Sequence, residues 1–289
     1  MSRPLNQLQL FAITENGPQS LPVPADATTQ DELYQGLPLG VYTALRTFEK
    51  HKFLYLEGHL ARLSHSMRLL GWNYQLDETR MRRAIHSVCS AAPWPEMRVR
   101  LDVLAQPTRY AGIEYREMIG LMRFEPLPAA LYADGVTVGF AEGLVRGQPL
   151  VKTAAFVEAR KAYSVGSATV YERLMLDDES RILEGFSSNF YAVHNGVLRT
   201  AGTGVLEGIT RKIILDLAAG LAIPLRLEAI HVSEIPDLEE AAISSSSRGL
   251  LPVVNIAGHP IGNGHPGPLC SRLHTAYDAF VERTVRPAI

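Results

Sequence analysis

The 289-residue sequence has little of what marks several large classes of protein. Its two cysteines, Cys89 and Cys270, lie far apart and near no histidine cluster, which argues against a disulfide framework, a redox pair or a metal site. A net charge of −2 gives no electrostatic reason to expect nucleic acid or an anionic membrane as a partner. No apolar run of about 18 residues occurs, so no membrane-spanning helix is predicted. We expect both cysteines to be buried apolar residues.

The N-terminus also lacks the apolar core of a secretory signal peptide, which favours a cytoplasmic location. Internal repeats and charge blocks are absent, and Ser244 to Ser247 form the one low-complexity tract. What is present is an ordinary globular composition, with 46% hydrophobic and 20% charged residues. The length allows one large domain or two ordinary ones.

Residue periodicity predicts mixed helices and strands in the first part of the chain. Residues 21–38 have an irregular pattern and are expected to be exposed. Two strands, over 40–45 and 52–56, are expected to pair as a hairpin. The further elements expected here are helices over 58–70 and 77–91 and strands over 97–105 and 115–124.

The tract 125–135, EPLPAALYADG, contains two prolines and is the best linker candidate. The sequence therefore predicts a small α+β domain over 1–125, an interdomain linker over 126–134 and a large domain over 135–289. Asn195-Gly196 predicts a type I′ hairpin. The other elements expected here are helices over 154–164, 208–221 and 268–283 and strands over 168–176, 181–183, 225–230 and 241–244.

The densest chemical signal runs from Glu184 to Ile214, EGFSSNFYAVHNGVLRT followed by GVLEGITRKII after three intervening residues. It combines a carboxylate, an apolar strand, a hairpin and a glycine loop that opens a helix. The backbone N–H groups of Gly208, Ile209 and Thr210 would point off a helix N-terminus, where the helix dipole and unpaired donors favour a phosphate.

The order Glu184, Asn189, Phe190, Tyr191, Leu198, Thr200 and then Gly208 to Arg211 resembles the class IV aminotransferase signature. That family includes branched-chain and D-amino-acid aminotransferases and aminodeoxychorismate lyase. The tract from His59 to Leu63, HLARL, is similar to the family's early helix. PLVKTAAFVEARK, residues 149–161, is similar to the tract that carries the family's Schiff-base lysine. The resemblance covers roughly residues 38–283.

The resemblance implies an α+β architecture of the pyridoxal 5′-phosphate (PLP) fold type IV. Such proteins have a small α+β domain, a larger pseudo-barrel domain, an active site between the domains and a homodimeric assembly. PLP is the implied cofactor, with Lys152 as the catalytic Schiff-base residue, Glu184 at the pyridine nitrogen and Arg62 on the phosphate. Apolar neighbours favour the neutral amine that Lys152 needs for attack. The other implied cofactor-binding residues are Ser188, Leu206, Gly208, Ile209, Thr210, Ser245 and Ser246.

Substrate contacts are expected from Tyr42, Arg46, Arg98, Arg100 and Ser247, with Arg109 as a further candidate. Arg98 and Arg100 alternate along a predicted strand and would share one face, where they could capture a carboxylate. We expect His59 and the other histidines to be structural, because the family uses lysine as its base.

Two departures from the family's pattern bear on the reaction. Val157 stands where branched-chain enzymes carry a tyrosine, and Tyr42 is the candidate for supplying that hydroxyl from another side. Thr43 replaces a glutamate of both aminotransferase groups and is closer to the lyase, whereas Gly208 to Arg211 favour an aminotransferase. The main expectation is amino transfer between an amino acid, or an amine, and a 2-oxo acid. The alternatives are an aminodeoxychorismate lyase and a PLP-binding protein without turnover.

Overall fold

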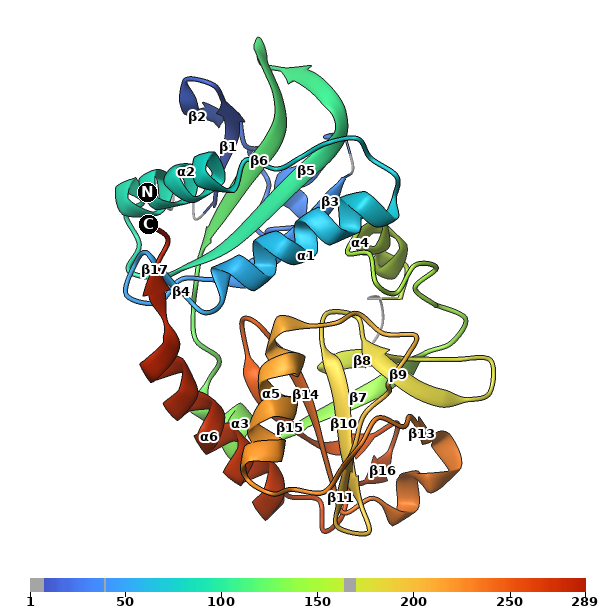
Figure 1. Ribbon diagram of the computed structural model, residues 1–289. Coiled ribbons are helices and arrows are strands. Elements are labelled where there is room, and N and C mark those ends of the chain that lie inside the picture. The colour runs from blue at the N-terminus through green and yellow to red at the C-terminus, as the bar shows by residue number, and fades with distance from the viewer. Residues whose placement is uncertain (1–7, 39, 164–169) are drawn as a thin grey trace. The chain divides into compact units, whose positions relative to one another are not determined.

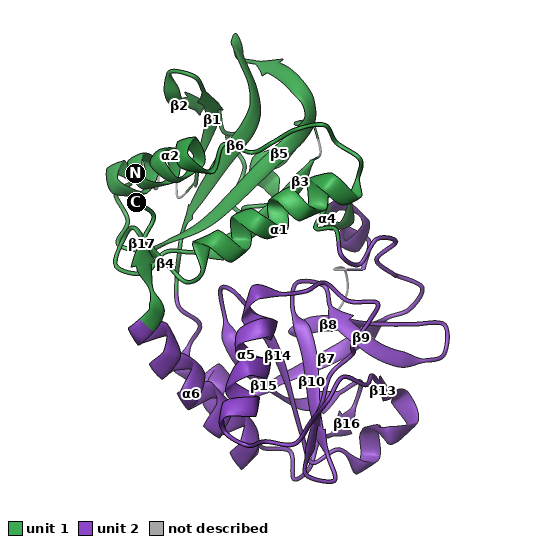
Figure 2. Cartoon of the chain, viewed as in Figure 1, with its two compact units in different colours: residues 1–125, 151–157, 284–289 green, residues 126–150, 158–283 purple. Residues whose placement is uncertain are grey.

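The computed structural model describes residues 8–38, 40–163 and 170–289 (Figure 1). The chain forms two compact units (Figure 2), of which the first comprises residues 1–125, 151–157 and 284–289 and the second residues 126–150 and 158–283. The break after residue 125 falls at the start of the predicted linker.

Two segments that the sequence assigned to the large domain belong instead to the first unit. Residues 151–157 do so because their backbone pairs with the start of a strand. The Tyr42 N–H donates to the Lys152 carbonyl at 2.9 Å, and the Ala154 N–H donates to the Gly40 carbonyl at 2.8 Å. Residues 284–289 do so through β17 (Arg286–Pro287), which pairs with β4 (Lys52–Phe53).

The first unit is built on a five-stranded antiparallel sheet in the order β2-β1-β6-β5-β3. One face packs against the helices α1 (Leu56–Leu69) and α2 (Glu78–Ala91) and forms the unit's core, in which Leu60, Met81 and Ile85 are fully buried. These residues recur at helical spacing, so one apolar stripe of each helix meets the sheet. The strands are β1 (Leu8–Thr14), β2 (Gly17–Leu21), β3 (Val41–Arg46), β5 (Met97–Tyr110) and β6 (Ile113–Arg123).

The predicted hairpin between residues 40–45 and 52–56 is wrong. β3 pairs with β5 along its whole length, whereas β4 has only two residues and pairs with β17. Glu49 and Lys50 both have positive φ angles, 45° and 72°, which close a tight turn with a single bridge between Phe48 and Lys52. The chain therefore leaves the sheet after this turn and enters α1.

Residues 21–38 are irregular, as expected, but they are not all exposed. Leu33 and Tyr34, in the short 3₁₀ helix Glu32–Tyr34, are buried against the sheet face that the long helices leave uncovered. The hairpin of β1 and β2, which the sequence did not predict, extends the same sheet.

The second unit is a closed barrel, which confirms the predicted pseudo-barrel. Six strands follow one another in the ring β10-β14-β15-β7-β8-β9, and β9 closes on β10 where Glu184 pairs with Asn189. The ring strands are β7 (Val136–Ala141), β8 (Glu172–Leu176), β9 (Arg181–Gly185), β10 (Asn189–His194), β14 (Glu240–Ser245) and β15 (Gly249–Ile256). Apolar side chains of these strands, such as Leu174, Phe190 and Leu251, form a buried core.

Shorter elements extend the barrel. The predicted strand over 225–230 is divided into β12 (Leu225–Arg226) and β13 (Ile230–His231). The type I′ turn is confirmed, because Asn195 and Gly196 have φ angles of 51° and 70° and join β10 to β11. The remaining elements are β11 (Val197–Arg199), β16 (His259–Pro260), the 3₁₀ helix Val232–Asp237 and the helices α3 (Ala129–Asp134), α4 (Ala154–Lys161), α5 (Ile209–Gly220) and α6 (Pro268–Thr284).

Residue 164 of one predicted helix and residues 168–169 of one predicted strand lie outside the described residues. Within the described part of the chain, no helix combines the length and apolarity needed to cross a membrane.

The contact of Tyr34 with the sheet predicts a steric cost at Gly120. A Cβ atom there would overlap the Tyr34 hydroxyl and crowd Leu33, so we expect Gly120→Ala to lower the free energy of unfolding by about 1–3 kcal/mol. Urea unfolding followed by tryptophan fluorescence measures this, because both tryptophans, Trp72 and Trp94, belong to the first unit. Gly220→Ala is the control, since nothing lies within 4 Å of its added Cβ. Equal stability of both variants would contradict the buried position of Tyr34.

Candidate active site

Lys152 lies beside β3 in the first unit. Its carbonyl accepts the Tyr42 N–H, and its own N–H lies 3.5 Å from the Ser66 Oγ of α1. Its Nζ lies 4.9 Å from the centroid of the Tyr42 ring. The structure therefore brings together two predicted site residues, Lys152 and Tyr42, through both backbone and side chain.

Arg100 also contacts the Tyr42 ring. The guanidinium carbon lies 4.2 Å from the Tyr42 ring centroid and 4.0 Å from that of Tyr34. The Arg100 Nη2 contacts Asp102 at 2.7 Å, and both side chains are buried. Arg100 Nη1 lies 3.5 Å from Asp31. A buried ion pair of this kind places the arginine between two rings and occupies its donors.

The other arginines predicted for substrate lie on β3 and β5. Arg98 and Arg100 share one face, as predicted, and Arg46 is the register partner of Arg98. Arg46 pairs with Glu96 at 3.3 Å and stacks on Phe124 at 4.1 Å. Arg109 pairs with Glu114 near the exposed tip of the β5–β6 hairpin, away from this cluster. The structure thus groups three of the four predicted arginines.

Arg62 belongs to a buried polar chain on the opposite face of β3. Its Nη2 donates to the Thr43 Oγ1 at 2.9 Å, and the same hydroxyl lies 2.8 Å from the His59 Nδ1. The Thr43 hydroxyl therefore connects Arg62 to His59 through two hydrogen bonds. Burial, helped by the positive charges of Arg62 and Lys152, holds the pKa of His59 well below its ordinary value. His59 is therefore neutral and orients Thr43.

Glu184 is a buried carboxylate of the second unit, with 2% of its surface exposed. Its Oε1 accepts from the Arg146 Nε at 2.8 Å. Its Oε2 accepts from the Asn189 Nδ2 at 3.2 Å and from the Leu206 N–H at 3.1 Å. The Asn189 amide also donates to the Leu206 carbonyl, at 2.9 Å. These contacts join Glu184 to the loop that leads to Gly208.

The start of α5 offers donors to an anion. The N-cap residue is Gly208, which has no side chain to cap the helix, and the first-turn N–H groups of Ile209 and Thr210 have no intrahelical acceptor, as at the start of any helix. The Gly208 N–H is used differently, since it donates to the Leu206 carbonyl at 2.8 Å. Glycine is required at 208 because a Cβ atom would overlap the Asn189 side chain.

The serine turn, residues 245–247, joins β14 to β15. β14 pairs with β10, so Ser244 faces Asn189 across the two strands, and the turn lies at the same barrel end as Ser188. In the second unit the structure thus brings together Glu184, Ser188, Leu206, the start of α5 and the serine turn.

These residues fit a pyridine ring with a phosphate group. Glu184 is an acceptor for a protonated ring nitrogen, and α5 supplies N–H donors for a phosphate. The Ser188 Oγ is buried without a hydrogen-bond partner among the described residues, which is rare in a folded protein and indicates a missing polar partner. The described residues hold no group of three or more histidine, cysteine or acidic side chains that could bind a metal ion.

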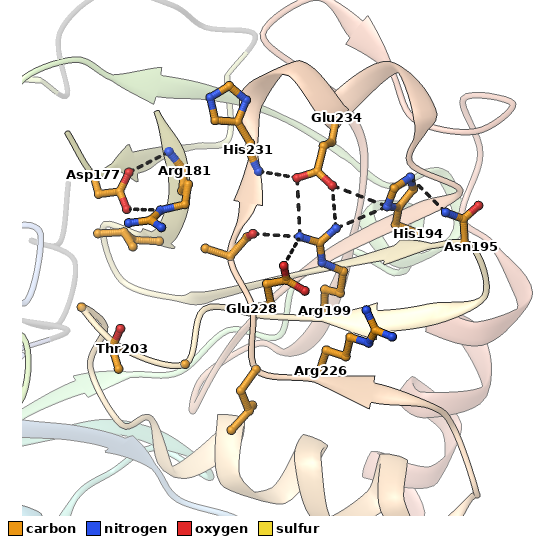
Figure 3. Close-up of a pocket in the computed structure, with 15 residues that line it drawn as sticks. Asp177, Arg181, His194, Asn195, Arg199, Thr203, Arg226, Glu228, His231 and Glu234 are labelled. Carbon is orange, nitrogen blue, oxygen red and sulfur yellow. Dashed lines mark hydrogen bonds and ion pairs between the residues drawn. The ribbon is translucent and has the colours of Figure 1, made fainter. Parts of the chain in front are cut away.

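A separate cavity of about 700 Å³ lies in the second unit and contains none of the predicted site residues (Figure 3). Two of its three arginines are already paired, Arg199 with Glu234 at 2.6 Å and Arg181 with Asp177 at 2.7 Å. The lining consists of Asp177, Arg181, Leu183, His194, Asn195, Arg199, Gly202, Thr203, Gly204, Arg226, Leu227, Glu228, Ala229, His231 and Glu234.

Several functional contacts were not predicted from the sequence. Arg146 lies in an irregular segment and belongs to no periodic pattern, so nothing marked it as a partner of Glu184. Asp102 is likewise unremarkable until the sheet places it next to Arg100. His59 was expected to be structural, and the structure adds its contact with Thr43. The only sequence signal was the i, i+3 spacing of His59 and Arg62, which puts both on one face of α1.

The closed barrel, with a buried carboxylate at its closure, and the lysine-bearing α+β unit are the architecture of PLP enzymes of fold type IV. A family model for class IV aminotransferases matches residues 40–256. The chain therefore belongs to the class IV aminotransferase family, whose members depend on PLP.

Individual relatives support this assignment. A D-alanine aminotransferase of Staphylococcus aureus (strain N315) is 34% identical over 103 residues, so the match spans only about a third of either protein, 35% of this chain and 36% of the relative. A putative branched-chain amino acid aminotransferase from Thermotoga maritima has a similar fold, with a TM-score of 0.75 and 21% identity over 96% of this chain and 97% of that one. A 4-amino-4-deoxychorismate lyase from Pseudomonas aeruginosa gives a TM-score of 0.69 and 24% identity over 90% and 96%.

The neutral state of His59 predicts a pH dependence of stability. Because the pKa of His59 in the folded chain lies below its ordinary value of 6.5, the unfolded chain binds a proton that the folded chain does not. His59 therefore stabilises the fold above pH 6.5, and this contribution is lost as the pH falls from 6.5 towards the lowered value. We expect His59→Asn, whose amide can still hydrogen-bond to Thr43, to flatten the decline of unfolding free energy between about pH 7 and pH 5.

Urea unfolding at several pH values measures this, with tryptophan fluorescence reporting on the first unit. The control is His65→Asn, which changes a partly exposed histidine of α1 in the same unit and should keep the parent's slope. Identical slopes for the parent and His59→Asn would mean that His59 titrates normally.

Proposed function

We propose that this protein is a PLP-dependent aminotransferase that moves an amino group between an amino acid, or a simple amine, and a 2-oxo acid. When bound, PLP supplies an electron-accepting ring. Lys152 would attach the cofactor covalently and carry protons on its Nζ, and Glu184 would hold the ring nitrogen protonated. The single observation that carries the proposal is the Glu184 carboxylate, which is buried, ionisable and already oriented by three donors.

The charge of Glu184 supports its proposed role. Hydrogen-bond donors around a buried carboxylate favour its ionised form. An ionised carboxylate is the group that keeps a pyridine nitrogen protonated. Arg146 would act as a positioning residue, since its Nε contacts the oxygen that Asn189 and Leu206 do not. In many enzymes, charged and polar groups oriented in advance in this way make the largest single contribution to the rate enhancement.

The phosphate-binding roles proposed here are those that the family resemblance implies. Arg62 would supply the guanidinium fork, and its orientation would depend on Thr43 and His59. Ile209, Thr210, Ser245 and Ser246 would supply neutral donors, and Ser188 and Leu206 would line the cofactor.

For the substrate, the contacts favour different roles for the arginines. Arg100 is engaged by Asp102, so we assign it to positioning Tyr42 rather than to binding a carboxylate. Arg46 and Arg98, which lie side by side on the same face, are the proposed carboxylate ligands, because the Arg46–Glu96 pair is more exposed than the buried Arg100–Asp102 pair. Tyr42 and Ser247 are proposed to contact the substrate as well.

The position of Thr43 removes the main sequence argument for elimination. From the sequence alone, this threonine was the main argument for the lyase. Its side chain is fully buried, and its hydroxyl is engaged by Arg62 and His59 on the face opposite Tyr42. Thr43 therefore acts on the phosphate arginine, and its presence does not require a lyase. A homodimer, which the family resemblance implies, and a cytoplasmic location complete the proposal.

The assignment of Lys152 is tested by reducing the PLP-loaded protein with borohydride and mapping the labelled peptide. The pyridoxyl group should appear on Lys152, and Lys152→Ala should lose both the label and turnover, because no second amine replaces it. Lys161→Ala is the matched control, since this exposed lysine pairs with Glu158 at 2.7 Å and should not affect labelling. Label on Lys161 or Lys212 of the parent would refute the assignment.

The reaction is tested by single-turnover spectroscopy of the PLP-loaded protein with panels of L-amino acids, D-amino acids and simple amines. At least one donor should convert the absorption band of the lysine-bound cofactor to that of pyridoxamine phosphate, and a 2-oxo acid should restore it. If no donor does so while aminodeoxychorismate yields pyruvate and 4-aminobenzoate, the protein is a lyase and transfer is excluded.

A further inference from the structure

Arg248 ends the turn that carries Ser245 to Ser247, and its side chain is only 11% exposed. Its Nη1 contacts the Glu172 Oε2 at 2.6 Å, its Nη2 donates to the Ser187 Oγ at 2.7 Å, and its Nε donates to the Ser245 Oγ at 2.8 Å. The Arg248 carbonyl accepts from the Tyr132 hydroxyl at 2.7 Å. All three guanidinium nitrogens are therefore engaged inside the second unit.

Glu172, at the start of β8, also contacts Ser187, one of the two serines to which Arg248 donates. Its Oε1 accepts from the Ser187 N–H at 2.6 Å and from the Ser187 Oγ at 3.0 Å. Burial by itself would raise the pKa of Glu172, but Arg248 and the Ser187 donors outweigh it and lower the pKa below its ordinary value. Glu172 is thus ionised, and the pair carries no net charge.

The pair ties together three segments that are distant in the sequence. Glu172 belongs to β8, Ser187 to the turn between β9 and β10, and Ser245 to the end of β14. Two of these segments carry proposed cofactor residues, Ser188 and the serine turn. The residues of the serine turn are only half-buried, so apolar packing does little to fix them. The directional hydrogen bonds of Arg248 are the contacts that can fix their orientation.

We propose that Arg248, held by Glu172, is a positioning residue that fixes the serine turn and the Ser187-Ser188 turn in the orientation that binds a phosphate monoester. This inference rests on the proposed function, and it assigns the serine turn to the phosphate end of the cofactor. Arg248 is not itself the phosphate ligand, because its donors are engaged and Glu172 neutralises its charge.

The shape of the guanidinium group makes this proposal specific to arginine. One planar group bridges Glu172, Ser187 and Ser245 at the same time, which the single ammonium of a lysine cannot do in the same geometry. Arg248→Lys therefore keeps the positive charge and disrupts the orientation. The variant separates positioning from simple charge attraction.

The test compares the dissociation constants of PLP and of pyridoxal, which lacks the phosphate, for the full-length protein. We expect Arg248→Lys and Glu172→Gln to weaken PLP binding about ten-fold or more and to leave pyridoxal binding unchanged within about two-fold. The matched control is Arg181→Lys, which alters an arginine–carboxylate pair of the same unit at a more exposed position and should change neither constant. Ser187→Ala removes only one hydroxyl and should weaken PLP binding by about three-fold.

The positioning role would be overturned if Arg248→Lys and Glu172→Gln weakened the binding of PLP and of pyridoxal equally, or if they did not weaken PLP binding. Should Arg248→Lys or Glu172→Gln not fold, Ser187→Ala decides by the same ratio of the two constants. A different result would contradict the proposed function itself, namely that borohydride treatment leaves Lys152 of the parent unlabelled. A labelled parent whose variants bind PLP as the parent does refutes the role of Arg248 alone.

Discussion

A buried carboxylate whose oxygens all find donors is the interaction on which the rest of the second unit depends. Glu184 accepts from Arg146, Asn189 and Leu206, and leaving such a charge unpaired would cost several kcal/mol, on the order of 3–5. Satisfying it fixes the segment around Arg146, the loop to α5 and the closure of the barrel, because Asn189 is also the register partner of Glu184. The residue that would meet the cofactor ring therefore also holds the fold together.

Two buried ionisable side chains of the first unit, Arg100 and His59, are accommodated in different ways. Arg100 keeps its charge and pairs with Asp102 between two tyrosine rings. His59 is instead neutral, because burial lowers its pKa, and its Nδ1 shares a hydrogen bond with the Thr43 hydroxyl. Both solutions leave a neighbouring side chain in one orientation, Tyr42 in the first case and Arg62 in the second. Positioning of the candidate site is thus a consequence of satisfying groups that water no longer reaches.

Local sequence patterns predicted the elements whose conformation is decided within a few residues. Asn195-Gly196 formed the expected turn because both residues tolerate positive φ, and the helices α1 and α2 follow the spacing of their apolar residues. The hairpin assigned to β3 and β4 was wrong for the opposite reason. Adjacent strands need not pair with each other, and β4 found its partner in β17, more than two hundred residues away. Nothing within residues 40–56 carries that information.

The sequence by itself determined which residues are chemically suited to the site, since Lys152, Glu184, Arg62 and the serine turn stand in a recognisable order. Their roles remain predictions, and the tertiary structure adds the contacts that orient them. Arg146, Asp102 and Arg248 belong to no motif, because an ion-pair partner is defined by a short distance in space and not by spacing along the chain. The contacts of Thr43 likewise could not be read from the sequence. Its chemistry suggested a lyase, and only the alternation of β3, which turns its hydroxyl towards α1, assigned it to Arg62.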